Sequence, residues 1–202
     1  PSTKLILSSS RLEYGIPKYL PVDEKHTLNP ISAYGLSKLA STQIAIVYAR
    51  QNNLNVTVFR TSNVYGPHVK KTFAGYNLVN YFIDLAKAGK EITIFGNGNQ
   101  QRDYIYIDDL MDAFTSAIIN VKSIGQIYNL GSGKGISLKE MAQTIIGSVG
   151  KGKLKFINWP KKYQEVETGN YITNIRKINK ELCFSPKVKF EDGIKMTINA
   201  LW

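Results

Sequence analysis

Cysteine, histidine and long apolar runs are scarce in this 202-residue sequence. The single cysteine, Cys183, permits no internal disulfide and agrees with a reducing cytoplasm. The two histidines, His26 and His68, lie too far apart to give a metal-ligand spacing. No stretch approaches the roughly 20 apolar residues that a membrane-spanning helix needs. The sequence therefore argues against a disulfide scaffold, a metal enzyme and a membrane protein.

Acidic residues are also few, 15 against 26 basic ones, which gives a formal net charge of +11. A basic surface can bind nucleic acid, but here no zinc-finger, RNP or basic-zipper motif accompanies the charge. The lysines are mostly dispersed, and the densest group is Lys151, Lys153, Lys155, Lys161 and Lys162. We therefore expect an anionic small molecule as the partner, with no nucleic acid and no membrane.

The first part of the chain alternates strand, helix and strand. Residues 4–9 and 56–59 are apolar runs that lead into polar residues, as strands of a parallel sheet do. Residues 32–52 between them carry apolar side chains at helical spacing, which we expect to pack on the sheet. These side chains are Leu36, Leu39, Ala40, Ile44 and Val47. Such a unit is half of a doubly wound sheet.

Helix and strand patterns continue to alternate in the rest of the chain, which makes the fold class α/β. Further helices are expected over residues 77–88, 110–120, 137–148, 175–182 and 191–201, and further strands over 92–95, 104–107, 127–130 and 154–157. Asp108 or Asp109 is expected to cap the helix that follows them, and Ser137 with Glu140 forms a capping box.

One pair of residues suggests proton transfer. Tyr34 and Lys38 are four residues apart, so they lie on one face of the predicted helix. A phenol becomes a useful base near neutral pH only when a nearby cation stabilises its phenolate. The bare Tyr-x-x-x-Lys pattern is common by chance, but Ser10 ends the preceding strand, where a hydroxyl could bond both the phenol and a substrate oxygen.

Five motifs, one of which contains this pair, are spread along the chain from Ser8 to Gly133. They are Ser8-Ser9-Ser10 before Tyr14-Gly15, Asn29-Pro30 before Tyr34-Gly35-Leu36-Ser37-Lys38, Arg60 before Asn63-Val64-Tyr65-Gly66-Pro67, Gly96 to Tyr104 with Arg102-Asp103, and Tyr128-Asn129-Leu130-Gly131-Ser132-Gly133. In their order and spacing they resemble the extended short-chain dehydrogenases/reductases that act on nucleotide-diphosphate sugars, the epimerase/dehydratase family.

The resemblance implies a role for each matched position. Tyr34 would be the acid/base that takes a proton from the sugar hydroxyl as hydride passes to NAD; Lys38 would assist it and hold the nicotinamide ribose. Ser10 would share the proton network, and Ser62 would lie against the nicotinamide. The nucleotide diphosphate and its base would be held by Asn63, Asn77, Leu78, Thr93, Phe95 and Arg102. Core packing is an equally good interpretation of Leu78 and Phe95.

Some positions depart from the family pattern. Dehydratases of the family carry Asp-Glu after the catalytic hydroxyl residue, whereas Arg11-Leu12 follow Ser10, which argues against 4,6-dehydration. The dinucleotide fingerprint is also not found: the turn from Gly131 to Ile136 lacks its third glycine position and the acidic residue about 20 positions later.

The resemblance therefore implies a partial Rossmann fold, a doubly wound parallel sheet lacking its first strands, plus a smaller α/β substrate-binding domain. Residues 1–74 would belong to the NAD-binding domain and residues 75–202 mainly to the substrate domain, with a segment near 104–130 returning to the Rossmann sheet. The chain alone is expected to be inactive. Alternatives are a catalytically silent nucleotide-sugar-binding module and a nucleotide-sugar reductase.

The beginning of the chain gives one more expectation. It opens with Pro1, and Leu5, Ile6 and Leu7 already read as a buried strand. An uncovered strand edge pairs readily with other chains. We therefore expect the segment before about Asn29 to be rearranged, mobile, or covered by a second copy in a homodimer or by a partner chain that completes the sheet.

Overall fold

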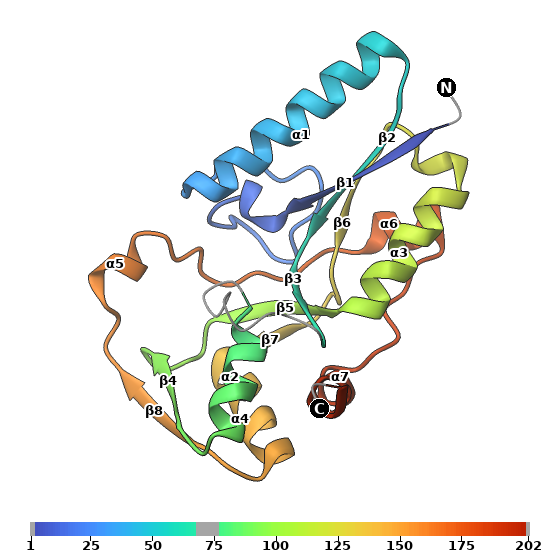
Figure 1. The fold of residues 1–202 in the computed structure, drawn as a ribbon. Coiled ribbons are helices and arrows are strands. Elements are labelled where there is room, and N and C mark those ends of the chain that lie inside the picture. The colour runs from blue at the N-terminus through green and yellow to red at the C-terminus, as the bar shows by residue number, and fades with distance from the viewer. Residues whose placement is uncertain (1–2, 68–76, 201–202) are drawn as a thin grey trace.

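The computed structural model describes residues 3–67 and 77–200 and confirms the α/β class (Figure 1). Three groups of strands are present, in the orders β1-β2-β6, β3-β5-β7 and β4-β8. Helices separate most consecutive strands, as the sequence pattern predicts. Within the described ranges, no helix is long and apolar enough to cross a membrane.

The first sheet consists of β1 (Lys4–Ser10), β2 (Asn55–Thr61) and β6 (Ile127–Leu130), all parallel. Helix α1 (Ala33–Asn52) lies on one side, and α3 (Ile107–Ile119) and α6 (Arg176–Leu182) lie on the other (Figure 1). Phe59 of β2 is fully buried and stacks on Phe114 of α3, with ring centroids 5.0 Å apart. The central strand is thus covered on both faces, and each of its residues from Val56 to Thr61 is buried.

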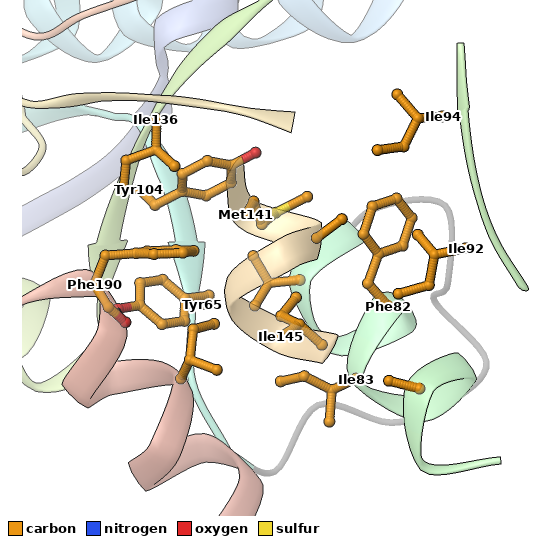
Figure 2. Close-up of a cluster of buried hydrophobic side chains, with 14 of the residues drawn as sticks. Tyr65, Phe82, Ile83, Ile92, Ile94, Tyr104, Ile136, Met141, Ile145 and Phe190 are labelled. Carbon is orange, nitrogen blue, oxygen red and sulfur yellow. The ribbon is translucent and has the colours of Figure 1, made fainter. Parts of the chain in front are cut away.

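The second sheet and the β4-β8 pair surround another core. The strands are β3 (Asn63–Tyr65), β5 (Gln101–Tyr106), β7 (Gly135–Ser137), β4 (Glu91–Phe95) and β8 (Lys153–Ile157). The helices α2 (Leu78–Lys87), α4 (Leu138–Val149) and α7 (Phe190–Ala200) pack with them. Figure 2 shows Met141 and Ile145 of α4 in the middle of this cluster, with the rings of Tyr65, Tyr104 and Phe190 on one side and Phe82, Ile92 and Ile94 on the other. Further short elements in the described residues are η1 (Arg11–Glu13), η3 (Val121–Ser123) and α5 (Lys161–Gln164).

The side of α1 that packs on the sheet is not the predicted one. Leu36, Ile44 and Val47 are at least half exposed, whereas Gly35 and Thr42 are buried. The hydroxyl of Thr42 donates to the buried carboxylate of Glu13 at 2.6 Å, and Gly35 lets the helix approach η1. A polar contact and a close backbone approach thus replace apolar packing, so the apolar stripe of α1 points outward.

The expected cap at Ser137 is confirmed, the expected cap at Asp108 or Asp109 is wrong, and Ser32 is a further cap. The side chain of Ser32 caps α1 and that of Ser137 caps α4, accepting the Glu140 N–H at 3.0 Å. Neither Asp108 nor Asp109 is a cap, because α3 already begins at Ile107. The carboxylate of Asp109 instead accepts the backbone N–H groups of residues 187 and 188.

The beginning of the chain is not rearranged. Strand β1 pairs with β2 in parallel register along its whole length and forms the end strand of its sheet, with Leu5 52% exposed. Whether another chain covers this edge stays a prediction. The proposed domain boundary between residues 74 and 75 lies outside the described residues.

Candidate functional site

A cleft of about 640 Å³ opens where the two sheets meet. Its walls come from the end of β1, the N-terminus of α1, the β2–β3 junction, the N-terminus of α2, the ends of β4 and β5, and the segment 159–167. The volume lies within the range of roughly 300–1,000 Å³ that is usual for small-molecule sites. In open parallel sheets ligands bind at the carboxyl ends of the strands, where β1 and β2 meet this cleft.

Tyr34 and Ser10 both line the cleft, whereas Lys38 is not one of its lining residues. The Lys38 Nζ is 5.7 Å from the centroid of the Tyr34 ring and donates to the carbonyl oxygen of Ser8 at 3.2 Å. The predicted helical spacing therefore does bring the ammonium beside the phenol. The carbonyl at the end of β1 holds the ammonium in place.

The hydroxyl of Ser10 is oriented by the turn that follows it. Its Oγ accepts the N–H of Leu12 at 3.2 Å and caps η1. Because a hydroxyl has one donor and two acceptor positions, this bond leaves the proton of Ser10 available to donate. The residue is 7% exposed and lines the cleft, so a ligand bound there can accept this proton.

Ser62 and Asn63 line the cleft at the junction of β2 and β3. The Asn63 amide donates to the carbonyl oxygen of Asp103 at 3.0 Å, which ties it to β5. Ser62 Oγ lies 3.5 Å from the Asp103 carboxylate. Both side chains are therefore held by β5 at positions where a ligand can contact them.

The N-terminus of α2 opens onto the same cleft. Asn77 caps this helix by accepting the Asn80 N–H at 3.2 Å, and Leu78 is its first residue. A helix N-terminus attracts anions through its free N–H groups and its dipole. The exposed fraction of Leu78 is 37%, so it is a cleft residue and does not belong to the core.

Phe95 stands at the end of β4 in a group of aromatic rings. Its ring stacks on that of Tyr163 with centroids 5.3 Å apart and packs on Trp159 at 5.4 Å, and all three line the cleft. Thr93 lies two residues earlier on the same face of β4 but is exposed and outside the cleft lining. Trp159 and Tyr163 were missed from sequence, because only the long-range β4-β8 pairing brings them to Phe95.

Arg102 lines the cleft with its charge already paired. Its guanidinium forms an ion pair with Glu167 and donates to the carbonyl oxygens of Gln101 and Gly169. Glu167 was not anticipated from sequence, since it is 65 residues away along the chain. An anionic ligand of Arg102 therefore competes with, or displaces, a carboxylate of the protein itself.

The glycine-rich turn after β6 has its N–H groups occupied by the protein. The backbone N–H groups of Ser132 and Gly133 donate to the buried carboxylate of Asp103 at 2.7 and 2.9 Å. Those groups are then not free to hold a phosphate. This geometry agrees with the lack of a dinucleotide fingerprint in the turn from Gly131 to Ile136. Among the described residues, no group of three or more His, Cys, Asp or Glu side chains could hold a metal ion.

A parallel sheet with a cleft at its carboxyl ends is the arrangement of nucleotide-binding α/β proteins. The family described as NAD dependent epimerase/dehydratase matches residues 1–131, and the chain belongs to that family. The resemblance stated from the motifs, and the NAD dependence that it implies for the family, are thus confirmed.

Individual relatives agree with this assignment. A putative UDP-glucose 4-epimerase of Methanocaldococcus jannaschii is 36% identical over 95% of this chain and 60% of its own length. The UDP-glucose 4-epimerase of Thermotoga maritima, solved with UDP-glucose, is similar with a TM-score of 0.89 and 29% identity over 98% of this chain and 62% of that one. The dTDP-glucose 4,6-dehydratase of Bacillus anthracis, solved with NAD, is similar with a TM-score of 0.84 and 28% identity. The match covers 97% of this chain and 60% of that one. The chain thus spans about 60% of the length of these relatives.

Proposed function

We propose that this protein contributes the catalytic and substrate-binding part of an NAD-dependent epimerase that acts on a nucleotide-diphosphate sugar through a keto intermediate. The observation that carries the proposal is one cleft that Ser10, Tyr34 and Arg102 line together, with the Lys38 ammonium 5.7 Å from the ring of Tyr34. Proton transfer and anion binding are thereby available within one site.

The proton chemistry belongs to three side chains. Tyr34 removes the proton of the reacting sugar hydroxyl and returns it later, and Ser10 donates a hydrogen bond to the same oxygen. Lys38 stabilises the phenolate, since a cation close to a phenol favours its ionised form. Bound NAD supplies the hydride acceptor. The donor set fits its nicotinamide end, since Tyr34 and Ser62 line the cleft with a phenol and a hydroxyl and the Lys38 ammonium lies 5.7 Å from the Tyr34 ring centroid.

The substrate is held mainly by charge and by aromatic surface. Arg102 and the N-terminus of α2 with Asn77 and Leu78 bind the diphosphate, because a guanidinium and helix N–H groups both suit phosphate oxygens. Asn63 contributes an amide. Phe95 gives the base a face to pack on. Thr93 does not line the cleft, so it contacts the base only if the substrate extends past Phe95.

The setting of the reaction is proposed from the sequence. A location of the protein in the cytoplasm agrees with its single cysteine.

Residues 1–74 form the last part of the NAD-binding domain and 75–202 mainly the substrate domain, with the segment near 104–130 returning to the first sheet. This division is supported by the pairing of β6 with β2. The 202-residue chain by itself is expected to be inactive, and a second copy or a partner chain is expected to cover its open surfaces.

Replacing Tyr34 by phenylalanine tests the proposal. In the protein as its gene encodes it, Tyr34→Phe should lower kcat by about 100- to 10,000-fold, the usual contribution of a positioned acid or base. Binding of nucleotide sugar should hardly change, because only a hydroxyl is lost. The measurement is the product ratio of a UDP-sugar incubation with NAD, followed by calorimetric titration of the sugar nucleotide.

Tyr48→Phe is the matched control, since Tyr48 lies on the same helix and is 58% exposed. Its turnover should equal that of the wild type. Wild-type turnover in Tyr34→Phe would exclude Tyr34 as the base. Net consumption of reduced cofactor with no epimer formed would instead indicate a reductase, and sugar-nucleotide binding with no reaction in the wild type would indicate a silent binding module.

A further inference from the structure

Arg11 is a buried cation in the cleft that the proposed mechanism does not use. It follows Ser10 directly, lines the cleft and is 8% exposed. Its Nη1 donates to Thr168 Oγ1 at 3.1 Å, and its guanidinium carbon lies 5.1 Å from the centroid of the Tyr171 ring. A hydrogen bond at one nitrogen and a neighbouring aromatic ring hold the group in position.

The protein gives this guanidinium no carboxylate of its own. In residues 3–67 and 77–200 the ion pairs involve other cations, and Glu167, which acts electrostatically on Arg11, makes its ion pair with Arg102. Burial, and then the charge of Arg102, lower the pKa of Arg11 to about 10, so the group remains protonated at neutral pH. Two guanidinium groups therefore share one carboxylate in this cleft.

A buried charge without a partner is costly, and an incoming anion can offset that cost. Arg11 has five N–H donors and gives one of them to a described protein atom, which leaves an edge for a planar acceptor. A carboxylate matches this edge with two parallel hydrogen bonds. The ligand group that fits is thus a carboxylate held in the cleft.

The place of Arg11 in the chain indicates which part of the substrate it meets. Its neighbour Ser10 and the facing Tyr34 mark the position of the reacting sugar hydroxyl in the proposed function. Arg102 and the N-terminus of α2 provide for the diphosphate. Arg11 is therefore nearest to the sugar ring and its substituents.

We propose that Arg11 is a specificity-determining residue that selects nucleotide sugars with a carboxylate on the sugar, that is, nucleotide-linked uronic acids. The proposal rests on the proposed function, because Ser10 and Tyr34 define where the sugar lies. It adds a substrate class to that function and a residue that enforces it.

Calorimetric titration of the protein as its gene encodes it tests this assignment. The probes are UDP-glucuronic acid, UDP-glucose and UDP. The wild type should bind UDP-glucuronic acid about 10- to 100-fold more tightly than UDP-glucose, the usual value of a hydrogen-bonded charge pair. Arg11→Met, which keeps much of the side-chain length, should lose this preference and keep the affinities for UDP-glucose and UDP.

A second variant protects the test against a folding defect. Arg11→Lys keeps the charge without the planar fork, so it should retain part of the preference for the acidic sugar. An equal loss of affinity for all three probes in Arg11→Met would overturn the proposal and assign Arg11 to the diphosphate. So would a wild type without preference for UDP-glucuronic acid. A wild type that binds none of the probes would overturn the proposed function itself, and a wild type that binds UDP and both sugars equally would overturn this inference alone.

Discussion

At the scale of single residues, Glu13 is a fully buried acid next to the cleft. Its carboxylate pairs with Arg60 Nε at 2.7 Å and accepts the hydroxyls of Thr42 and Ser9. Arg60 also donates to the Tyr14 hydroxyl at 3.1 Å, and burial raises the pKa of Tyr14 to about 12, so this phenol stays neutral. These bonds link β1, η1, α1 and β2 directly behind Ser10.

Removing the charge of Glu13 should therefore destabilise the fold. Glu13→Gln leaves the Arg60 cation buried without a counter-charge, which costs about 3–5 kcal/mol in comparable buried pairs. Glu91→Gln is the control, because Glu91 pairs with Lys155 at 3.3 Å on the exposed surface, where such pairs contribute at most about 1 kcal/mol. Urea unfolding followed by circular dichroism measures both. Equal losses would show that the buried network contributes no more than a surface pair.

Single residues also show what the sequence can and cannot predict. Tyr34 and Lys38 were found because their pairing is set by the pitch of one helix, and Ser10 because it ends a recognisable strand. Glu167 and Arg102 are 65 positions apart, so their ion pair depends on the tertiary fold. The same holds for Thr168 beside Arg11. Local spacing thus predicts the groups for proton transfer, whereas the charge balance of the cleft needs the structure.

At the scale of elements, the contact between α1 and η1 sets the position of Tyr34. Gly35 comes next to it on the buried side of the helix, and a Cβ there would lie 2.5 Å from the Leu12 carbonyl oxygen and 3.1 Å from Pro30 Cβ. A backbone atom cannot move aside as a flexible side chain can. The helix approaches η1 this closely because residue 35 is glycine.

Gly35→Ala should accordingly lower stability and turnover together. The added methyl pushes the start of α1 away from η1, at the cost of about 1–3 kcal/mol that overpacking usually brings, and it moves Tyr34 relative to Ser10. Gly147→Ala in α4 is the control, since nothing lies within 4 Å of its added Cβ, and it should stabilise by up to about 1 kcal/mol. Thermal unfolding and turnover of both variants decide the matter. A stabilised, fully active Gly35→Ala protein would contradict the close contact.

Helix starts can be predicted from the sequence where a side chain hydrogen-bonds to the backbone a few residues away. Ser32 and Ser137 are caps that a reader of the sequence can find, because the bond spans three residues. The prediction of which face of α1 packs on the sheet was wrong because that face is set by a long-range contact. Thr42 bonds to a buried carboxylate 29 residues away, and no local pattern indicates this bond.

At the scale of the whole molecule, two features leave apolar or unpaired surface open in the described part of the chain. Strand β1 ends its sheet with Leu5 exposed, and α1 presents Leu36, Ile44, Val47 and Tyr48 outward along one stripe. Scattered exposed apolar residues are normal, but a continuous stripe marks a surface that another chain covers. The proposed second copy or partner chain would bury it.

Charges placed on the stripe should therefore weaken association without harming the fold. In the double variant Ile44→Glu with Val47→Glu, both side chains are already half or more exposed, so the free energy of unfolding should change by no more than about 0.5 kcal/mol per site. Carboxylates buried against a partner would be unpaired, which is strongly unfavourable. Sedimentation velocity over a concentration series should show the wild type associating and the variant shifted toward the monomer.

Met196→Glu, an exposed apolar position on α7, is the control and should associate as the wild type does. A wild type that remains monomeric throughout the series, or a double variant that associates unchanged, would show that the stripe is not an interface between copies.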